Sequence, residues 1–449
     1  MTSSRLASLS LLLCCAASAS APARAQSLPA LYEAAIRHDA AFQSARAQYA
    51  ASLARADQAF AGLLPSVSLS AGYSESQFKN YSPLAARDIV NQTATLSAVQ
   101  PLYRPGNLLG WEQALRQKVQ ARVQFDNAAQ DLMLRLSQAY FDVLAATDTL
   151  AFVQAQKAAV AEQLASAKRN FEVGTATITD TREAEARFDL VGAQEIAADN
   201  DLRVKRLALD TLVGRANTAP LTLRAPLELS RLEPADLQFW IIRSSDASPA
   251  VQQARLGFEI ARLEVDKARA AGKPTVDLTV SHNQTRAPDG TTSSPAGTRN
   301  HTSTIGVNFS MPLFSGYAIE NRIKESLALQ TKAEADLEAA RRSVAQGVRS
   351  AWFGVVSGLG QVKALEAAER SSQLALDANR LGYQVGVRIN IDVLNSQSQL
   401  FQTKRDLAVA RYNLLLGGLR LRQAAGLLSA QDLSEVGAAL DARPEAAKP

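Results

Sequence analysis

The fold is decided by Tyr383-Gln-Val-Gly-Val-Arg-Ile-Asn-Ile-Asp-Val-Leu-Asn395, because the chain contains a second copy of its pattern. The other copy, 212 residues earlier, reads Phe171-Glu-Val-Gly-Thr-Ala-Thr-Ile-Thr-Asp180. Both place an aromatic residue, a Val-Gly pair and an Asp in the same register. A Gly that accepts positive φ ends one helix, and the Asp beyond it suits the N-cap of the next. The repetition predicts two equivalent helix corners, at 173–180 and 385–392.

Long stretches with apolar residues at three- and four-residue steps flank both corners, which is the helical period. Residues 107–172 contain no proline, and at ~1.5 Å per residue they predict a helix of about 100 Å. Residues 181–213 predict a helix about half as long, and 317–382 with 392–426 repeat the pair. Helices of this length are typical of coiled coils and structural repeats.

Before each long helix the sequence changes to strict alternation of apolar and polar residues, which is the period of a half-buried strand. A helix precedes the strands in each half, over 28–64 and 248–272. The alternation predicts two β-hairpins, at 66–100 and 275–311, built from the strands 66–74, 93–100, 275–281 and 303–311.

The duplication divides the chain into an expected order of parts. In each half, the helix before the strands and the helix after the corner together match the long helix in length, so they stack end to end beside it. Three prolines mark the connection between the halves. The predicted parts are a signal peptide (1–25), a first structural repeat (26–213), a linker (214–246), a second structural repeat (247–428) and a loosely held C-terminal tail (429–449).

The first residues have the features of a secretory signal. An arginine, Arg5, precedes a short apolar run, and Ala23-Arg24-Ala25 is an A-x-A cleavage motif. The apolar run is too short for a transmembrane helix. Cys14 and Cys15 are the only cysteines, and they leave a lipoprotein signal as the alternative, although the bulky Leu13 disfavours it. After cleavage the chain has neither disulfide nor thiol chemistry.

Composition gives no sign of an enzyme or a nucleic-acid partner. Losing Arg5 and Arg24 takes the net charge from +5 to +3, and the basic residues are scattered opposite acidic ones. No later run offers ~18 consecutive apolar residues. The histidines, His38, His282 and His301, lack metal-ligand spacing and have no nucleophile nearby. We therefore expect a non-enzyme with no metal, cofactor or nucleic acid.

The four predicted strands raise the question of what their apolar face contacts. Four strands cannot close a membrane barrel, for which about eight is the minimum, and a strand is stable in lipid only if every edge is paired. The strands therefore belong either to a soluble sheet or to a barrel shared between subunits. The intervening Ser, Thr, Asn, Asp and Gly residues suit a water-filled lumen. Three copies would supply twelve strands.

Several motifs resemble the TolC family of trimeric outer-membrane efflux and secretion channels. They are the corner motif from Tyr383 to Leu394, the duplicated helix–hairpin–helix plan, the strand exits Pro101-Leu-Tyr-Arg-Pro-Gly106 and Pro312-Leu-Phe-Ser-Gly316, and Ala410-Arg-Tyr-Asn-Leu414. The resemblance covers essentially the whole chain after the signal peptide. It implies a mainly helical fold with two β-hairpins per chain, whose trimer forms a twelve-stranded barrel in the outer membrane of a Gram-negative bacterium and an α-helical tunnel in the periplasm.

The resemblance also implies partners. A homotrimer would contact outer-membrane lipid, and a periplasmic adaptor (a membrane fusion protein) and an inner-membrane transporter, either ABC or proton-driven, would dock at the corners. In this sequence the corner positions are Val173-Gly174 and Val385-Gly386. Two substrate classes remain open, polypeptides in type I secretion and small toxic molecules in multidrug efflux, and we favour the first.

In that family the corner end is a closed iris, and the resemblance assigns residues to it. Tyr383 and Arg388 would bond to Thr179 and Asp180, since an Arg fork and a Tyr hydroxyl are good donors to a carboxylate. The alternative is that Asp180 and Asp392 only cap their helices. Capping and latching are compatible.

The family also places a ring of acidic side chains at the narrowest point. Asp392 matches the first position of that ring, whereas the second is occupied here by Asn395. Three carboxylates rather than six per trimer would still favour cations, but less strongly. A rival to the channel is a periplasmic coiled-coil adaptor or structural protein without a barrel, which explains the long helices but not the four alternating strands.

Overall fold

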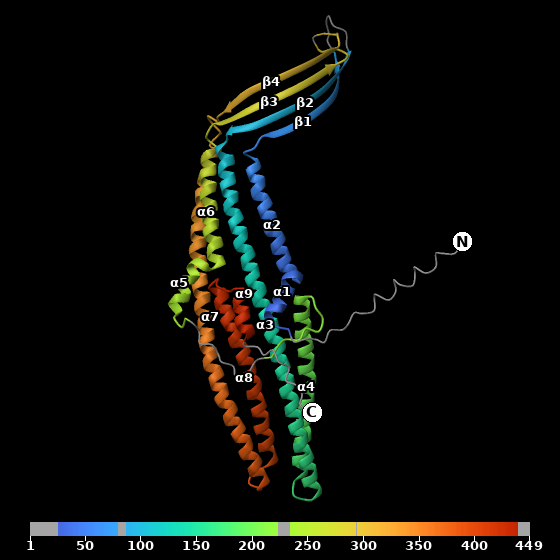
Figure 1. Cartoon of the computed structure of the whole chain (residues 1–449), viewed down its shortest axis with the longest axis vertical. Coiled ribbons are helices and arrows are strands. Elements are labelled where there is room, and N and C mark those ends of the chain that lie inside the picture. The colour runs from blue at the N-terminus through green and yellow to red at the C-terminus, as the bar shows by residue number, and fades with distance from the viewer. Residues whose placement is uncertain (1–25, 80–86, 223–233, 293, 439–449) are drawn as a thin grey trace, which may run out of the picture. The chain divides into compact units, whose positions relative to one another are not determined.

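The structure, a computed structural model, describes residues 26–79, 87–222, 234–292 and 294–438. The predicted signal peptide 1–25, with Cys14 and Cys15, lies outside the described residues. Elements in the described part follow the predicted order (Figure 1). They are α1 (Leu28–His38), α2 (Ala40–Ala61), β1 (Ser66–Phe78), β2 (Arg87–Tyr103), α3 (Pro105–Glu172), α4 (Ile178–Val213), α5 (Leu237–Ala247), α6 (Pro249–Ala270), β3 (Thr275–Ala287), β4 (Thr298–Ser310), α7 (Ala318–Gln384), α8 (Asn390–Ala424) and α9 (Ala430–Ala438).

All four strands form one antiparallel sheet in the order β1-β2-β3-β4. The two predicted hairpins are joined because β2 pairs with β3, from Gln92↔Arg286 to Tyr103↔Val276. The strands extend beyond the predicted limits, so that β1 reaches Phe78 and β3 reaches Ala287. The predicted ends were too early because polar residues occupy both faces near the turns, which hides the alternation although the backbone pairing continues.

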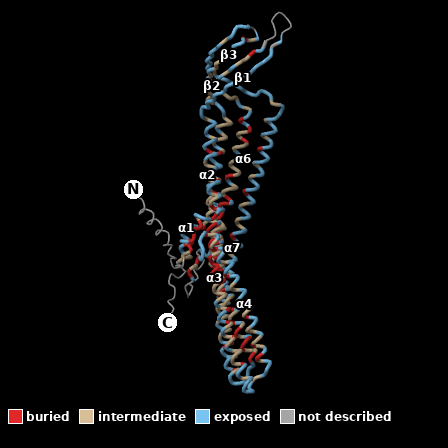
Figure 2. The backbone as a smooth tube through the Cα atoms, turned by 90° about the vertical axis from the view of Figure 1, so that its right-hand side faces the viewer, coloured by how far each residue is buried: buried red, intermediate tan, exposed pale blue. Residues whose placement is uncertain are grey.

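The register gives the sheet one apolar and one polar face. One row across the four strands is Val67, Ala98, Val280 and Ile305, and the next row, on the other face, is Ser68, Ser97, Ser281 and Thr304. No other described residue covers the apolar face along the outer strands: Val67 is 69 %, Leu69 76 % and Ile305 75 % exposed. The edge strands β1 and β4 are mostly exposed, and β2 and β3 mostly intermediate (Figure 2).

The chain forms two compact units. One unit, 44–128 with 242–346, contains the sheet and the helix segments adjoining it. At the start of α3, the Arg104 guanidinium donates two hydrogen bonds to the Asp277 carboxylate of β3, at 2.7 and 2.6 Å. Further along, Glu264 of α6 accepts from Gln113 of α3 at 3.1 Å and from Arg322 of α7 at 2.8 Å.

The other unit comprises 1–43, 129–241 and 347–449. Its described part contains α1, α4, α8, α9, the remainders of α3 and α7, and the first residues of α2 and α5. Tyr140 and Phe141 of α3 are buried, and the Phe141 ring stacks on Tyr412 of α8 with centroids 6.0 Å apart. The Tyr412 hydroxyl donates to the Asp148 carboxylate of α3 at 2.6 Å. This unit carries both helix corners.

The first helix prediction was wrong in one respect. The expected helix over 28–64 is divided into α1 and α2 at Asp39, which has extended backbone. Its Oδ1 accepts a hydrogen bond from the Phe42 backbone N–H at 2.7 Å, as an N-cap does. Arg135 of α3 holds the same carboxylate through two bonds of 3.1 Å. A capping Asp therefore ends the helical run that the apolar periodicity suggested.

Two segments expected to be irregular contain helices. Part of the predicted linker 214–246 forms α5, in which Trp240 is buried and donates through its indole N–H to the Pro234 carbonyl at 2.9 Å. Residues 430–438 of the predicted loose tail form α9, which packs on α1 with Leu433 fully buried. In both cases one buried apolar side chain stabilises a helix too short to show periodicity.

Candidate functional site

The two helix corners have the same backbone. Gly174 has φ +77° and Gly386 has φ +79°, so both glycines take the left-handed conformation that the sequence predicted at the helix ends. The turns close equivalently, with Thr175 N donating to Asn170 O at 2.8 Å and Val387 N to Gly382 O at 2.9 Å. The valines beside the glycines, Val173 and Val385, are exposed. Each corner therefore presents an apolar side chain to solvent.

The N-caps of the helices after the corners lie three residues earlier than predicted. The N-cap of α4 is Thr177 and that of α8 is Ile389, so Asp180 and Asp392 lie at the third helical position rather than at the N-cap. Thr177 and Asp180 form a capping box, in which Asp180 Oδ2 accepts from the Thr177 backbone N–H at 3.0 Å. Asp392 instead forms an ion pair with Arg388 at 3.6 Å.

Asn390, the first residue of α8, connects this helix to both helices of the first corner. It is fully buried. Its amide nitrogen donates to the Asp180 carbonyl at 3.2 Å, and its amide oxygen accepts from the Gln163 side chain of α3. A buried amide with both ends bonded fixes the distance between the elements it joins. Within one chain, Asn390 thus fastens α8 to α3 and α4.

The predicted latch residues lie at the same level. The Tyr383 hydroxyl accepts a hydrogen bond from Asn170 of α3 at 3.3 Å, so it does reach the first helix pair. Thr179 is exposed in the first turn of α4, and Arg388 is paired with Asp392. These are contacts within a single chain. The bonds of Tyr383 and Arg388 to Thr179 and Asp180 stay a prediction.

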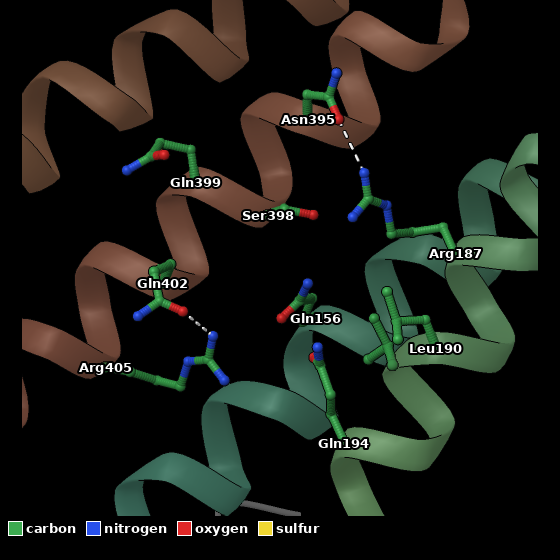
Figure 3. Close-up of a pocket in the computed structure, with 10 residues that line it drawn as sticks. Gln156, Arg187, Leu190, Gln194, Asn395, Ser398, Gln399, Gln402 and Arg405 are labelled. Carbon is green, nitrogen blue, oxygen red and sulfur yellow. Dashed lines mark hydrogen bonds between the residues drawn. The ribbon is translucent and has the colours of Figure 1, made fainter.

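Beyond Asn390, α8 is separated from α3 and α4 by a polar cavity of about 390 Å³ (Figure 3). Arg187 of α4 crosses its rim and donates to Asn395 of α8 at 2.9 Å. Gln156 of α3 is buried there, and its side-chain oxygen has no hydrogen-bond partner among the described residues. The lining consists of Gln156, Arg187, Leu190, Val191, Gln194, Asn395, Ser398, Gln399, Gln402 and Arg405.

Apolar contact between the two helix pairs is limited at this level. A small cluster joins Leu394 of α8 to Val160, Ala167 and Ala184 of the first pair. Leu376, Val393 and Leu400 form a separate cluster within the second pair. Separating the pairs at this level would therefore expose the Leu394 cluster and several amides, at a smaller cost than opening a continuous apolar core.

The sequence alone did not identify Asn390, Gln163 or Asn170. One signal was present, because Asn390 stands where the first copy of the repeat has Ile178, 212 residues earlier. A polar residue in one copy of the repeat, at a position where the other copy has an apolar residue, indicates that the two corners make different contacts there. Gln163 and Asn170 resemble ordinary surface residues of a long helix.

In the part of the chain that the structure describes, no group of three or more His, Cys, Asp or Glu side chains is placed to hold a metal ion. None of the helices in the described ranges is long and apolar enough to cross a membrane.

Two long helix pairs with glycine corners, joined to an antiparallel sheet with one exposed apolar face, define a class of outer-membrane channel. The chain belongs to the outer membrane efflux protein family, which it matches over residues 31–215 and 240–427. It is 32 % identical over 416 residues to outer membrane protein TolC of Vibrio cholerae, covering 93 % of this chain and 94 % of that one. It is 29 % identical to the proteases secretion protein PrtF of Dickeya chrysanthemi, covering 94 % and 93 %.

Solved structures show the same fold. The CmeC outer membrane channel of Campylobacter jejuni superposes with a TM-score of 0.77 at 16 % identity, covering 92 % of this chain and 90 % of that one. The outer membrane protein VceC of Vibrio cholerae gives 0.75 at 20 % identity, covering 89 % and 96 %. Family membership, the mainly helical fold with two hairpins and the location in the outer membrane are thereby confirmed, and the family consists of channel proteins.

Proposed function

We propose that this protein is the outer-membrane exit duct of a tripartite export system, and that it acts as a homotrimer without catalytic activity. The observation that carries the proposal is the sheet. Among the described residues, β1 and β4 each pair on one side only, and each edge is 13 residues long. Three copies, joined β4 to β1, would pair every edge and close a twelve-stranded barrel.

Lipid makes that closure necessary. An unpaired backbone N–H or C=O group in hydrocarbon costs several kcal/mol, so an open sheet edge is not stable there. The exposed apolar rows through Leu69 and Ile305 would face the acyl chains. The hydroxyl row of Ser68, Ser97 and Ser281 would line the lumen, which suits a water-filled pore.

The corner region supplies a gate in this proposal. We propose that the chain is built from two helix–hairpin–helix units, the repeats 26–213 and 247–428, which the linker 214–246 connects. Opening is the movement of the α7–α8 pair away from α3–α4, which breaks the bonds of Asn390. Across the trimer, Tyr383 and Arg388 bond to Thr179 and Asp180 in the closed state.

The constriction and the docking surface follow from the same residues. The three copies of Asp392 in the trimer form a ring of carboxylates. Asn395 supplies amides at the second position, so the constriction binds cations less strongly than it would with a second ring of carboxylates. The exposed Val173 and Val385, with Gly174 and Gly386, provide the surface on which a periplasmic adaptor docks. The adaptor connects the duct to an ABC or proton-driven inner-membrane transporter, which supplies the energy.

Two substrate classes fit this duct, polypeptides and small toxic molecules. Relatives named for secretion include PrtF and the alkaline protease secretion protein AprF of Pseudomonas aeruginosa, which is 31 % identical over 356 residues. Relatives named for efflux include BepC of Brucella suis, 26 % identical over 307 residues. The secretion relatives are the more similar, which favours polypeptide export.

The test is electrical recording on the purified full-length mature chain in planar bilayers. We expect the protein to require detergent, to migrate as an SDS-resistant trimer and to conduct ions in discrete steps. A species that is soluble in buffer alone and does not conduct would contradict the duct and support the periplasmic adaptor.

A further inference from the structure

The apolar face of the sheet ends in a cluster of basic side chains near the β3–β4 turn. This cluster, the basic cap, consists of Arg286 and His282 on β3 and Arg299 and His301 on β4. We propose that the basic cap binds the phosphate groups of an anionic membrane lipid. The proposal rests on the proposed function, because this face meets lipid only when the sheet forms a barrel.

The strand register places all four residues on the lipid side. Side chains two apart share a face, and Arg286 and His282 have the same parity as Val276 and Val280 of the apolar rows. On β4, Arg299 and His301 have the parity of Ile305. The basic cap therefore continues the apolar face toward the turn, and does not belong to the hydroxyl-rich lumen face.

The two arginines are in an unfavourable arrangement without an anion. Arg286 and Arg299 are direct cross-strand partners, and like charges directly opposite each other destabilise a sheet. Among the described residues, no carboxylate forms an ion pair with either. With its amide in the orientation that gives its oxygen donors, Gln284 accepts from Arg299 Nε at 3.2 Å and Nη2 at 3.0 Å. A neutral amide does not cancel the charge of Arg299.

The histidines extend the cluster toward the apolar rows. The rings of His282 and His301 are stacked with centroids 6.0 Å apart. His282 Nδ1 is 2.9 Å from the Ser303 hydroxyl. His282 also lines a cavity of about 290 Å³ together with apolar side chains such as Val67 and Leu96. Polar groups beside an apolar cavity match the junction of a lipid headgroup and its acyl chains.

Strand geometry places the arginines at headgroup depth. Arg286 is ten residues beyond Val276, which is about 34 Å along an antiparallel strand. With a tilt of ~40°, this is about 26 Å along the barrel axis, and over that length the side chains on this face change from apolar (Val276, Leu278, Val280) to polar (His282, Gln284). The apolar face therefore ends at Val280, and the basic cap would lie beyond it, where lipid phosphates are.

The side chains of the basic cap are suited to bind phosphate groups. Guanidinium forks bind phosphate oxygens in bidentate fashion, and basic clusters at membrane interfaces recognise phosphorylated headgroups. Two arginines side by side fit a lipid with more than one phosphate, such as the bis-phosphorylated glycolipid lipid A, better than a zwitterionic lipid.

The experiment compares two charge-matched variants of the trimer in detergent. Arg286→Gln with Arg299→Gln removes the arginines of the basic cap. The control, Arg349→Gln with Arg370→Gln, removes two exposed charges from α7. Binding of lipid A and of its dephosphorylated form is measured by native mass spectrometry. We expect wild type and control to prefer lipid A, and the cap variant to bind it about 30-fold more weakly, at ~1 kcal/mol per arginine.

Three outcomes would overturn the inference. Equal lipid A binding by the cap variant and the control would show that the arginines do not hold phosphate. Equal binding of the dephosphorylated lipid by wild type would remove phosphate as the ligand. Full competition by millimolar inorganic phosphate would assign a free-phosphate site rather than a headgroup site. Conductance is recorded on the same samples: if wild type conducts, these outcomes refute only the lipid site, whereas absent conductance refutes the duct.

Discussion

Replacing Asn390 with alanine tests whether the contacts between the two helix pairs hold the corner end closed. The substitution removes the bonds to the Asp180 carbonyl and the Gln163 amide, each worth about 1 kcal/mol net. The closed arrangement loses about 2 kcal/mol, which corresponds to a shift of roughly 30-fold toward the open state.

The assay is single-channel recording in planar bilayers, with the open probability as the readout. Gln373→Ala is the matched control, because its amide donates at 3.1 Å to Asp377 within the same helix and joins no second element. An open probability for Asn390→Ala within about threefold of the control would refute the assignment. A double-mutant cycle with Gln163→Ala adds a second criterion, since contacting residues couple by ~0.5–3 kcal/mol.

Three further predictions concern the corners and the pH dependence of stability. Tyr383→Phe combined with Arg388→Ser should raise single-channel conductance by removing latch bonds, and an unchanged conductance would show that these residues do not close the iris. Asp392→Ala should weaken block by multivalent cations added to the corner side, and a block that survives intact would move the constriction elsewhere. The Arg135 guanidinium holds the pKa of the Asp39 carboxyl below its ordinary value of about 4, so Asp39 stabilises the fold above that pH and loses the contribution as the pH falls through its folded pKa. Arg135→Gln should therefore flatten the decline of the thermal midpoint below about pH 4 relative to wild type, and parallel curves would contradict the assignment.

The long elements were predictable from the sequence because each is fixed by local periodicity. An apolar residue every three to four positions over some 66 residues admits only a helix, and α3 and α7 were predicted nearly to their ends. The glycines at 174 and 386 were predictable for the same reason, since positive φ is a local requirement. The strands were predicted where apolar and polar residues alternate strictly, and their parts near the turns were missed because polar residues occupy both faces there.

The remaining features depend on contacts between residues far apart in sequence. Asp39 divides a helix because Arg135 and the Phe42 N–H hold its carboxylate, and α9 forms because Leu433 is buried against α1. The pairing of Asn390 with Gln163 spans 227 residues. No local pattern encodes such partners, so sequence reasoning located the corners but not the residues that join the helix pairs.

The central claim is that β4 of one copy pairs with β1 of the next to close the barrel. The two native cysteines lie in the predicted signal peptide, residues 1–25, whose cleavage would leave the introduced cysteines as the only thiols. Ser70→Cys on β1 is combined in turn with Thr302→Cys, Thr304→Cys and Asn308→Cys on β4, and the oxidised protein from conducting samples is run on denaturing gels. The account predicts that at least one pair yields a covalent trimer, whereas only monomers, or an open ladder beyond the trimer, would contradict it.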